Sequence, residues 1–492
     1  MPCDGQRDLL KGTIEEEMVT LDPNIDQKEP WEASLYEEME KFKPEVQEQL
    51  WNKRSIYHLP AFSKLSKAST VLTPQVVSFG PYHHGEPNLK LVEHYKRKTL
   101  LYFLHDAKLR PGNVINAMKG VVEELQAHYE YLEDKWKNKM EFVKLMVTDG
   151  CFMLELLRGD FSKFPTNDPI FGDHAASHII PHIKKDMLML ENQLPLLVLK
   201  TLLLEERSRR NESPDLLLER SRRNESPESS DSPSEIILTD DQVINNLVFK
   251  FFEMKGMLNN TTLHLGLHVL DLYRKSLCET QEAFGKFWEV EQKRPYICTN
   301  ATAVELHEAG VRLEISKSYI ISHIDFHEGV LTVPNFDINN ATESTFLNLI
   351  MAFEHLHPGL RDVVTSYICF LGDLIHSASD VQLLRSANII RLTDVTDKDA
   401  AEILNRLTKD VVYEPIFEVN YVRFRIKKYS RRICGRVNRL LKTRVKKWFS
   451  ILMNLHFSNP WSTIGIIAAA VALVLTFIQT YYAILSYKYP KK

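Results

Sequence analysis

The sequence has few cysteines and lacks the short motifs of common enzymes and metal-binding modules. Its six cysteines lie far apart in a chain of 492 residues, and none of them forms a C-x-x-C pair. This spacing excludes a zinc ribbon and a small disulfide scaffold. The sequences G-x-x-x-x-G-K-[ST] and G-x-S-x-G are also missing, so P-loop and hydrolase chemistry have no candidate residues. The acidic N-terminus has no apolar run, so we expect no secretory signal there.

Acidic residues are missing from one end of the chain. Residues 421–492 contain fifteen Lys and Arg and no Asp or Glu, although the net charge of the whole chain is only −4. Residues 1–420 therefore carry 46 basic and 65 acidic residues, a net charge of −19. With 44% hydrophobic and 26% charged residues, the chain has the composition of a globular protein. An acidic globular body is therefore joined to a basic tail.

A long uncharged run follows this basic stretch. The 22 residues from Ile464 to Leu485 include no charged side chain. As a helix they would span about 33 Å, against about 30 Å for the hydrocarbon core of a bilayer. Trp461 precedes the run and several tyrosines end it, as is typical of membrane interfaces. The pattern predicts a C-terminal transmembrane helix at 461–487, and a buried core helix is the alternative.

The flanking charges predict the orientation of this helix. Twelve basic residues lie between Tyr421 and Lys447, whereas only three follow the run. The positive-inside bias therefore places the body in the cytosol. We expect a single-pass protein of the plasma membrane, and an endomembrane is the alternative. The 421–460 segment would contact anionic lipids. A basic run can also bind nucleic acid, but we do not expect this so close to a transmembrane helix. The residues expected at the membrane surface are Arg431, Arg432, Lys442, Arg444, Lys446 and Lys447.

The body shows mainly helical periodicity. Apolar residues recur at helical spacing in 142–156, 243–251 and 346–356, with further helices expected at 364–375 and 400–411. Residues 319–334 alternate instead, which predicts a small β-hairpin around Gly329. We therefore predict a mainly α fold with one β-hairpin. The expected parts are a flexible acidic tail (1–45), two helical halves (46–204 and 236–420), the linker between them (205–235), the basic segment and the span.

The linker contains a tandem duplication. The sequence RSRRNESP occurs at Arg207–Pro214 and again at Arg220–Pro227, followed by a segment rich in Ser and Pro. Such composition cannot bury a core, so we expect an exposed loop. Ser213, Ser226 and Ser232 each precede a proline and are candidate phosphorylation sites, because a phosphate could pair with the nearby arginines. An inert insertion is the alternative.

Seven passages of the chain, together with the C-terminal run, resemble the plant domain-of-unknown-function 247 family. They are VSFGPYHHGEPNL (Val77–Leu89), EHYKR (Glu93–Arg97), DGCFMLELLR (Asp149–Arg158), DMLMLENQLPLLVL (Asp186–Leu199), ATAVELHEAGVRLE (Ala301–Glu314), TESTFLNLIMAFEH (Thr342–His355) and DVQLLRSANII (Asp380–Ile390). The resemblance implies a mostly helical plant membrane protein with no established enzymatic activity. Some relatives are implicated in grass self-incompatibility, where recognition works through partner proteins.

The sequence GPYHHG at Gly80–Gly85 is the best candidate for a ligand-binding or partner-binding site. Its glycines and proline would present Tyr82, His83 and His84 on a loop, where imidazoles can bind a ligand or move protons. Adjacent histidines rarely hold one metal together, because successive side chains diverge. The alternative is a turn whose rings only contact neighbouring backbone groups.

Two other groups of polar residues have simpler interpretations. His174, His178 and His182 recur every four residues with Asp186 one turn later, but we expect Pro181 to interrupt the helix and therefore expect no metal site. Glu191, Asn192 and Gln193 interrupt an apolar run, where buried polar groups need hydrogen-bond partners. We expect them to specify the fold, with a polar ligand pocket as the alternative.

These patterns favour a membrane-anchored recognition or signalling protein that binds other proteins from the cytosolic face. We expect no catalytic residues, no metal and no cofactor. The partners would be the bilayer, its anionic lipids and unidentified proteins, with no nucleic acid. One alternative is a receptor-like body outside the cell, as in self-incompatibility. Another is an enzyme that uses the Tyr82–His84 loop.

Overall fold

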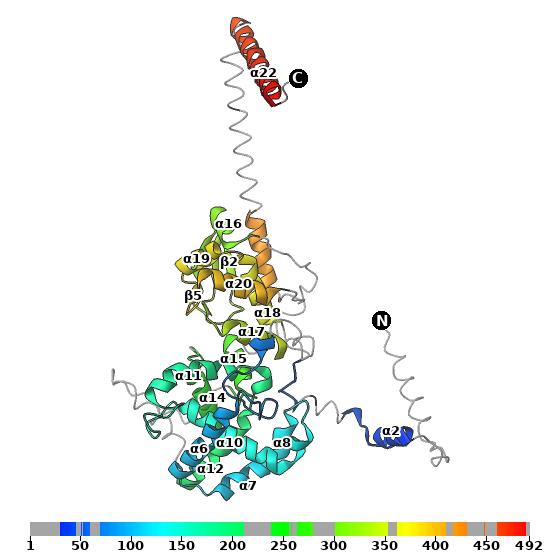
Figure 1. Cartoon of the computed structure of the whole chain (residues 1–492), viewed down its shortest axis with the longest axis vertical. Helices are drawn as coiled ribbons and strands as arrows, with labels where there is room; N and C mark the ends of the chain where they lie inside the picture. Colours follow the sequence, from blue (N-terminus) through cyan, green and yellow to red (C-terminus); the bar gives the residue numbers. More distant parts are fainter. Residues whose placement is uncertain are drawn as a thin grey trace.

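The structure is a computed structural model of the chain, mainly helical with a few short strands (Figure 1). It describes residues 30–45, 51, 53–59, 69–210, 238–254, 257, 263–278, 301–352, 362–409, 416, 418–430, 447 and 460–488. The mainly α fold class predicted from the sequence is confirmed.

The first half of the body is built around the long helix α10 (Lys139–Arg158). Asn138 begins this helix by accepting hydrogen bonds from the backbone of Met140 and Glu141, and Gly159 ends it with a φ of 67°. Three of the helices around it, α6, α7 and α12, pack against its sides. The helices of this half are α5 (Ser69–Leu72), α6 (Lys90–Asp106), α7 (Pro111–Gly120), α8 (Val122–Ala127), α9 (Asp134–Lys137), α10, α11 (Asp173–Asp186), the 3-10 turn Leu190–Asn192 and α12 (Leu196–Arg210). Two helices of the predicted second half, α14 (Asp240–Phe251) and α15 (Val269–Leu277), also pack here, because α14 contacts α10 and α12 and α15 contacts α14.

The second half packs helices around α20, and it carries the strands. Helices α17, α18 and α19 contact α20, whose N-terminus is closed by a capping box at Thr396 and Asp399. The elements are α16 (Ala303–Glu308), β1 (Arg312–Ile315), β2 (Asp325–His327), β3 (Val330–Val333), β4 (Phe336–Ile338), α17 (Thr342–Ile350), α18 (Val363–Leu374), α19 (Ala378–Ser386), β5 (Ile390–Leu392) and α20 (Asp397–Thr408).

The predicted β-hairpin is confirmed. Strands β2 and β3 pair antiparallel, with Asp325 opposite Thr332 and His327 opposite Val330. Glu328 and Gly329 form the turn with φ values of 48° and 84°, the left-handed geometry that favours tight hairpins. The sequence did not predict β1, which pairs parallel to β3, or the parallel pair β4 and β5.

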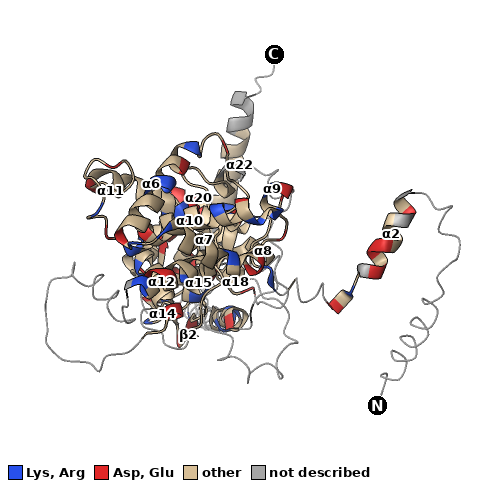
Figure 2. Cartoon of the chain, turned by 90° about the horizontal axis from the view of Figure 1, so that it is seen from below, with Lys and Arg blue, Asp and Glu red and all other residues tan. Residues whose placement is uncertain are grey.

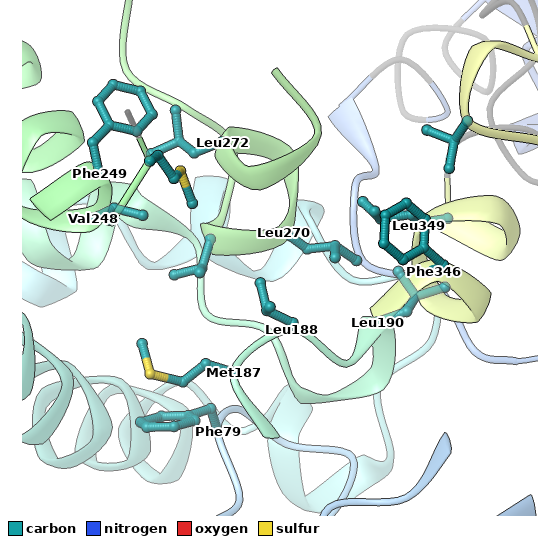
Figure 3. Close-up of a cluster of buried hydrophobic side chains, with 14 of the residues drawn as sticks. Phe79, Met187, Leu188, Leu190, Val248, Phe249, Leu270, Leu272, Phe346 and Leu349 are labelled. Atoms are coloured by element: carbon teal, nitrogen blue, oxygen red, sulfur yellow. The ribbon is translucent and has the colours of Figure 1, made fainter. Parts of the chain in front are cut away.

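One apolar interior runs through both halves. In Figure 3, Leu190 of the first half lies beside Phe346 and Leu349 of α17, and all three side chains are buried. The backbone N–H of Leu190 also donates to Oδ1 of Asn348, at 2.8 Å. The two predicted halves therefore share a core.

The basic stretch begins inside the folded body. Residues 418–430 are helical, and Val422 and Ile426 are buried. Arg423 is also buried, and its guanidinium lies 2.7 Å from Asp373. The predicted boundary at residue 421 therefore falls within a packed helix, because the apolar side of this segment belongs to the core.

The predicted flexible tail contains a helix. α2 (Pro30–Lys41) is described, whereas residues 1–29 lie outside the described part. Figures 1 and 2 show α2 apart from the helices of the body. The sequence did not predict this helix.

The last described helix, α22 (Pro460–Lys488), covers the predicted span. Within the residues that the structure describes, no single helix combines the length and apolarity needed to cross a membrane. The segments Asp173–Asp186 and Leu190–Arg209 satisfy that requirement only as a pair, and a bend of 113° separates them. Val471–Tyr482 is a shorter apolar helical stretch within α22. The transmembrane helix therefore stays a prediction.

Candidate functional site

The GPYHHG sequence lies in a loop, residues 75–86, that is held against the segment Glu191–Gln193. Asn192 lies between them, where its Oδ1 accepts from the backbone of Phe79 at 2.6 Å and its Nδ2 donates to the Val77 carbonyl at 3.0 Å. Asp186 accepts from the backbone of Val76 at 2.7 Å and of Val77 at 3.0 Å. Of the polar residues that interrupt the apolar run, Asn192 therefore hydrogen-bonds the backbone of this loop, and Asp186 joins it from the end of α11, as expected of fold-specifying residues.

Gln193 completes this attachment from the other side. Its Nε2 donates to the carbonyls of Met187 and Met189 at 2.7 and 2.6 Å, and its Oε1 accepts from the backbone of Leu270 at 3.1 Å. Its own carbonyl accepts from the hydroxyl of Tyr129 at 3.1 Å. The segment therefore joins the loop, α15 and the end of α11.

The backbone of the loop comes closest to the Glu191–Gln193 segment at Gly80. Its φ of 73° lies in the left-handed region, and a Cβ built there would be 2.8 Å from the Gln193 carbonyl and 2.9 Å from the Tyr129 hydroxyl. Its N–H donates to Asp149 Oδ2 at 2.9 Å. No other residue fits this position without displacing the backbone.

A buried cluster of charged side chains contacts Gly80 through Asp149. Lys96 of α6 is fully buried, and its Nζ lies 2.8 Å from Asp149 Oδ1 and 2.6 Å from Glu93 Oε1. It also donates to the Ser78 carbonyl, while the Ser78 hydroxyl donates to Glu93 at 2.7 Å. Burial raises the pKa of Asp149, and the Lys96 ammonium opposes that change. One ammonium and two carboxylates thus hold the start of the loop to α6 and α10.

His83 is buried between two carboxylates. Its Nδ1 lies 2.7 Å from Glu86, and its Nε2 lies 3.5 Å from Oε2 of the buried Glu191. Burial lowers the pKa of His83, but hydrogen bonding to Glu191 and Glu86 outweighs burial and raises its pKa above the ordinary value. The structure therefore favours the charged imidazolium at this position.

His84 has the opposite electrostatic environment. Its ring packs edge-on against Trp136, with centroids 5.2 Å apart, and its Nδ1 lies 3.5 Å from Glu93. Burial lowers the pKa of His84, and Lys96 adds to this effect while Glu93 opposes it. The pKa values of the two adjacent histidines are therefore shifted in opposite directions by different neighbours.

Tyr82 and His58 close the outer side of the site. Their rings lie 3.8 Å apart at an angle of 30°. His58 Nδ1 lies 3.0 Å from Oε1 of Glu191, the same carboxylate that contacts His83. Burial raises the pKa of the Tyr82 hydroxyl well above its ordinary value. Tyr82 therefore remains neutral, and its ring packs between the loop and residues 54–59.

The raised pKa of His83 predicts a pH-dependent stability. A histidine whose pKa is raised on folding contributes stability that is fully present below its ordinary value of 6.5 and lost as pH rises through the folded-state pKa. Replacing His83 by glutamine should therefore reduce the loss of stability between about pH 6 and pH 9. The size of this reduction depends on the ratio of the proton affinities of His83 in the folded and unfolded chain. Each factor of ten in that ratio corresponds to about 1.4 kcal/mol. Urea unfolding across this range measures the effect.

The matched control is His178→Gln, because His178 is exposed on α11. Its profile should follow that of the wild-type chain. A His83→Gln profile with the same slope as both would show that the two carboxylates do not stabilise the charged form of His83.

The three histidines of α11 lie on a helix that continues through Pro181. The rings of His174 and His178 are 5.1 Å apart, and both side chains are exposed. Pro181 does not interrupt the helix, contrary to the prediction, because α11 runs from Asp173 to Asp186 with the proline inside it. Asp186 faces the 75–86 loop and does not join the histidines.

Several predicted residues lie outside the described part of the chain. They are the candidate phosphorylation sites Ser213, Ser226 and Ser232 and the basic residues Arg431, Arg432, Lys442, Arg444 and Lys446. Lys447 is described and exposed.

The chemistry available at the loop is limited by its internal contacts. Among the described residues, no group of three or more His, Cys, Asp or Glu has a metal-holding arrangement. A cavity of about 450 Å³ lies elsewhere, at α7, α8 and the start of α10, and is lined by Lys119, Gly120, Val122, Glu123, Lys139 and Met140. Tyr82 stacks on His58, and His83 contacts Glu86 and Glu191.

The sequence reasoning missed His58, Lys96 and Asp149. Asp149 had a signal, because it is a carboxylate among the apolar residues of the helix predicted at 142–156. Such a residue needs a buried partner, and its partner is Lys96. His58 had no comparable signal, because Glu191 lies 133 residues away in sequence.

Two curated proteins of Arabidopsis thaliana resemble the chain along most of its length. The UPF0481 protein At3g47200 is 27% identical over 449 residues, which cover 85% of this chain and 84% of that protein. A second UPF0481 protein, At3g02645, is 24% identical over 514 aligned positions, covering 88% of this chain and 90% of that protein. No solved structure matches the chain.

The family comparison covers the body and most of α22. The model of DUF247, described as a plant protein of unknown function, matches residues 56–475. This range contains the 75–86 loop, the Lys96 cluster and the Glu191–Gln193 segment. The chain therefore belongs to the DUF247 family of plant proteins of unknown function.

Proposed function

We propose that this protein is a membrane-anchored recognition protein that binds other proteins from the cytosolic face. The observation that carries the proposal is the exposure of α22. Its large apolar side chains from Val471 to Tyr482 are between 46% and 77% exposed. A continuous apolar helix surface of this kind is unfavourable in water and is typical of a membrane-contacting segment.

The surrounding sequence supports the same role. The uncharged run Ile464–Leu485 lies entirely within α22. The basic residues lie before it, and the positive-inside bias supports a cytosolic body. The proposal makes the anionic lipids of the cytosolic leaflet the nearest partners of the basic segment.

Protein binding is proposed in preference to catalysis. His83 lies between Glu86 and Glu191, and the ring of Tyr82 is stacked on His58. These contacts favour a rigid loop over a site in which imidazoles exchange protons with a substrate. The scaffold would therefore present its exposed helices to a partner.

Charged substitutions in α22 test the anchor. Replacing Leu473, Leu475 and Phe477 by aspartate should shift the full-length protein from the membrane pellet to the supernatant, because each central aspartate costs about 2.5–3.5 kcal/mol of insertion free energy. Carbonate-washed membranes from plant cells measure the distribution. The control rearranges the residues of 464–485 without changing their composition, and it should remain in the pellet. Retention of the aspartate variant would contradict anchoring by α22.

The same membranes test the side on which the body lies. Asn340 is exposed and begins the sequon Asn340-Ala341-Thr342, so it would accept a glycan if the body were translocated. A cytosolic body should be digested by protease added to intact vesicles and should show no glycosidase-sensitive mass at Asn340. A protected, glycosylated body would instead favour the receptor-like alternative.

A further inference from the structure

The helix α2 carries an exposed apolar stripe. Trp31, Leu35, Met39 and Phe42 are 69%, 47%, 53% and 59% exposed. Their spacing of three or four residues places Trp31, Leu35 and Met39 on one side of α2, and Phe42 follows directly after the end of the helix at Lys41. The helix also carries four glutamates and one lysine, and Glu32 and Glu38 flank the stripe. Such a helix is typical of a segment that docks on an apolar surface with basic edges.

The outer face of α6 has the matching character. Leu91 and Leu101 are 69% and 62% exposed. At helical spacing, the exposed residues on this side also include Lys90, His94, Arg97, Lys98 and His105, with no acidic residue among them. The acidic residues at its margins have other contacts, since Glu93 contacts Lys96 at 2.6 Å and Asp106 lies 3.7 Å from Lys163.

The two surfaces have similar lengths and opposite charges. From Trp31 to Met39 the stripe extends about 12 Å, and from Leu91 to Leu101 the face extends about 15 Å. Figure 2 shows acidic residues along α2 and basic residues at α6. Packing the leucines of α6 against the aromatic and aliphatic groups of α2 would remove both from water.

The chain between them is long enough for docking within one molecule. The ten residues between Phe42 and Lys53 span at most about 36 Å. The folded end of this connection lies near α6, because the His58 ring is 3.8 Å from Tyr82 and His84 lies 3.5 Å from Glu93, in the first turn of α6.

We propose that α2 docks, through Trp31, Leu35, Met39 and Phe42, onto the outer face of α6 in the same chain. A short tether gives α2 a high effective concentration at this face. The glutamates of α2 favour this basic face over an anionic leaflet. The docking does not depend on the membrane anchor and would cover a surface on the body that is otherwise open to partners.

Photo-crosslinking of the full-length, detergent-solubilised chain tests the docking. Trp31 is replaced by benzoylphenylalanine, the protein is irradiated, and tryptic peptides are identified by mass spectrometry. We expect monomeric products joined to peptides from Leu91–His105, with a yield independent of protein concentration. The same probe at Glu40, on the opposite side of α2, should give a much lower yield.

Charge reversal supplies the control for folding and specificity. Arg97→Glu with Lys98→Glu should lower the yield about fivefold, as expected for two reversed charges at an exposed contact. Adding Glu32→Lys and Glu38→Lys should restore it, whereas Lys119→Glu, on α7, should leave it unchanged. The proposal would be overturned if the probe crosslinked to another part of the chain, to a second copy or to detergent, or if it gave no crosslink. So would a yield that the reversal does not change while the melting temperature is preserved.

Discussion

Replacing Lys96 by methionine should lower the free energy of unfolding by about 3–5 kcal/mol, because it removes one partner from a buried ion pair. Asp149 would remain fully buried without its ammonium, and Glu93 would lose its contact at 2.6 Å. Methionine preserves much of the volume of the side chain, so most of the loss is electrostatic. Urea unfolding followed by circular dichroism measures the change.

The matched control lies on the same helix. Lys98 of α6 is exposed, and Lys98→Met should change the stability by less than about 0.5 kcal/mol. Equal effects of the two substitutions would show that the buried cluster does not stabilise the fold. A smaller loss in Lys96→Met with Asp149→Leu than in Lys96→Met alone would identify the unpaired carboxylate as the cause.

Replacing Gly80 by alanine should cost about 3 kcal/mol or more, since it combines left-handed backbone strain with a steric clash. The added Cβ would be 2.8 Å from a backbone carbonyl, which cannot move away as a flexible side chain can. The loss should also weaken the attachment of the 75–86 loop, so the backbone N–H groups of Val77 and Phe79 should exchange faster with solvent. Hydrogen exchange and urea unfolding measure these two effects.

Substitution of Gly85 distinguishes left-handed backbone strain from the steric clash. It has a φ of 91°, yet a Cβ there meets nothing within 4 Å. Gly85→Ala should therefore cost only the conformational part, about 1–2 kcal/mol. If both variants lost the same stability, the contact between Gly80 and Gln193 would not be needed.

The larger helices were predictable because their signal is local. The apolar residues of 142–156 repeat at helical spacing, and α10 buries them. The hairpin at β2 and β3 was predictable for a similar reason, since its turn and both strands are consecutive in sequence. The strands β1, β4 and β5 are only three or four residues long and pair in parallel with strands that do not follow them directly in the chain, so no local pattern marks them.

The site was predictable in its residues but not in its contacts. The GPYHHG sequence identified a special loop, and Glu191–Gln193 identified buried polar groups. Nothing in the sequence connected them, because Phe79 and Asn192 are 113 residues apart. The pKa difference between His83 and His84 depends on which carboxylates and cations surround each ring, and only the folded chain determines these neighbours.

The packing of α12 against α14 explains where the chain tolerates evolutionary change in length. Lys200 and Asp241 are paired at 2.7 Å, and Arg207 pairs with Asp240, so the ends of both helices are fixed by their own contacts. The first copy of the duplicated RSRRNESP sequence begins at Arg207, in the last turn of α12, so the expected exposed loop does not include residues 207–210. The second copy, Arg220–Pro227, lies in the chain between the two helices. Because each doubling of a loop costs only about 0.6 kcal/mol in closure entropy, such a duplication can arise without disturbing the interior. Selection for the fold therefore leaves this position open to new sequence, while the two segments that meet at Gly80 and Gln193 are not free to vary in length.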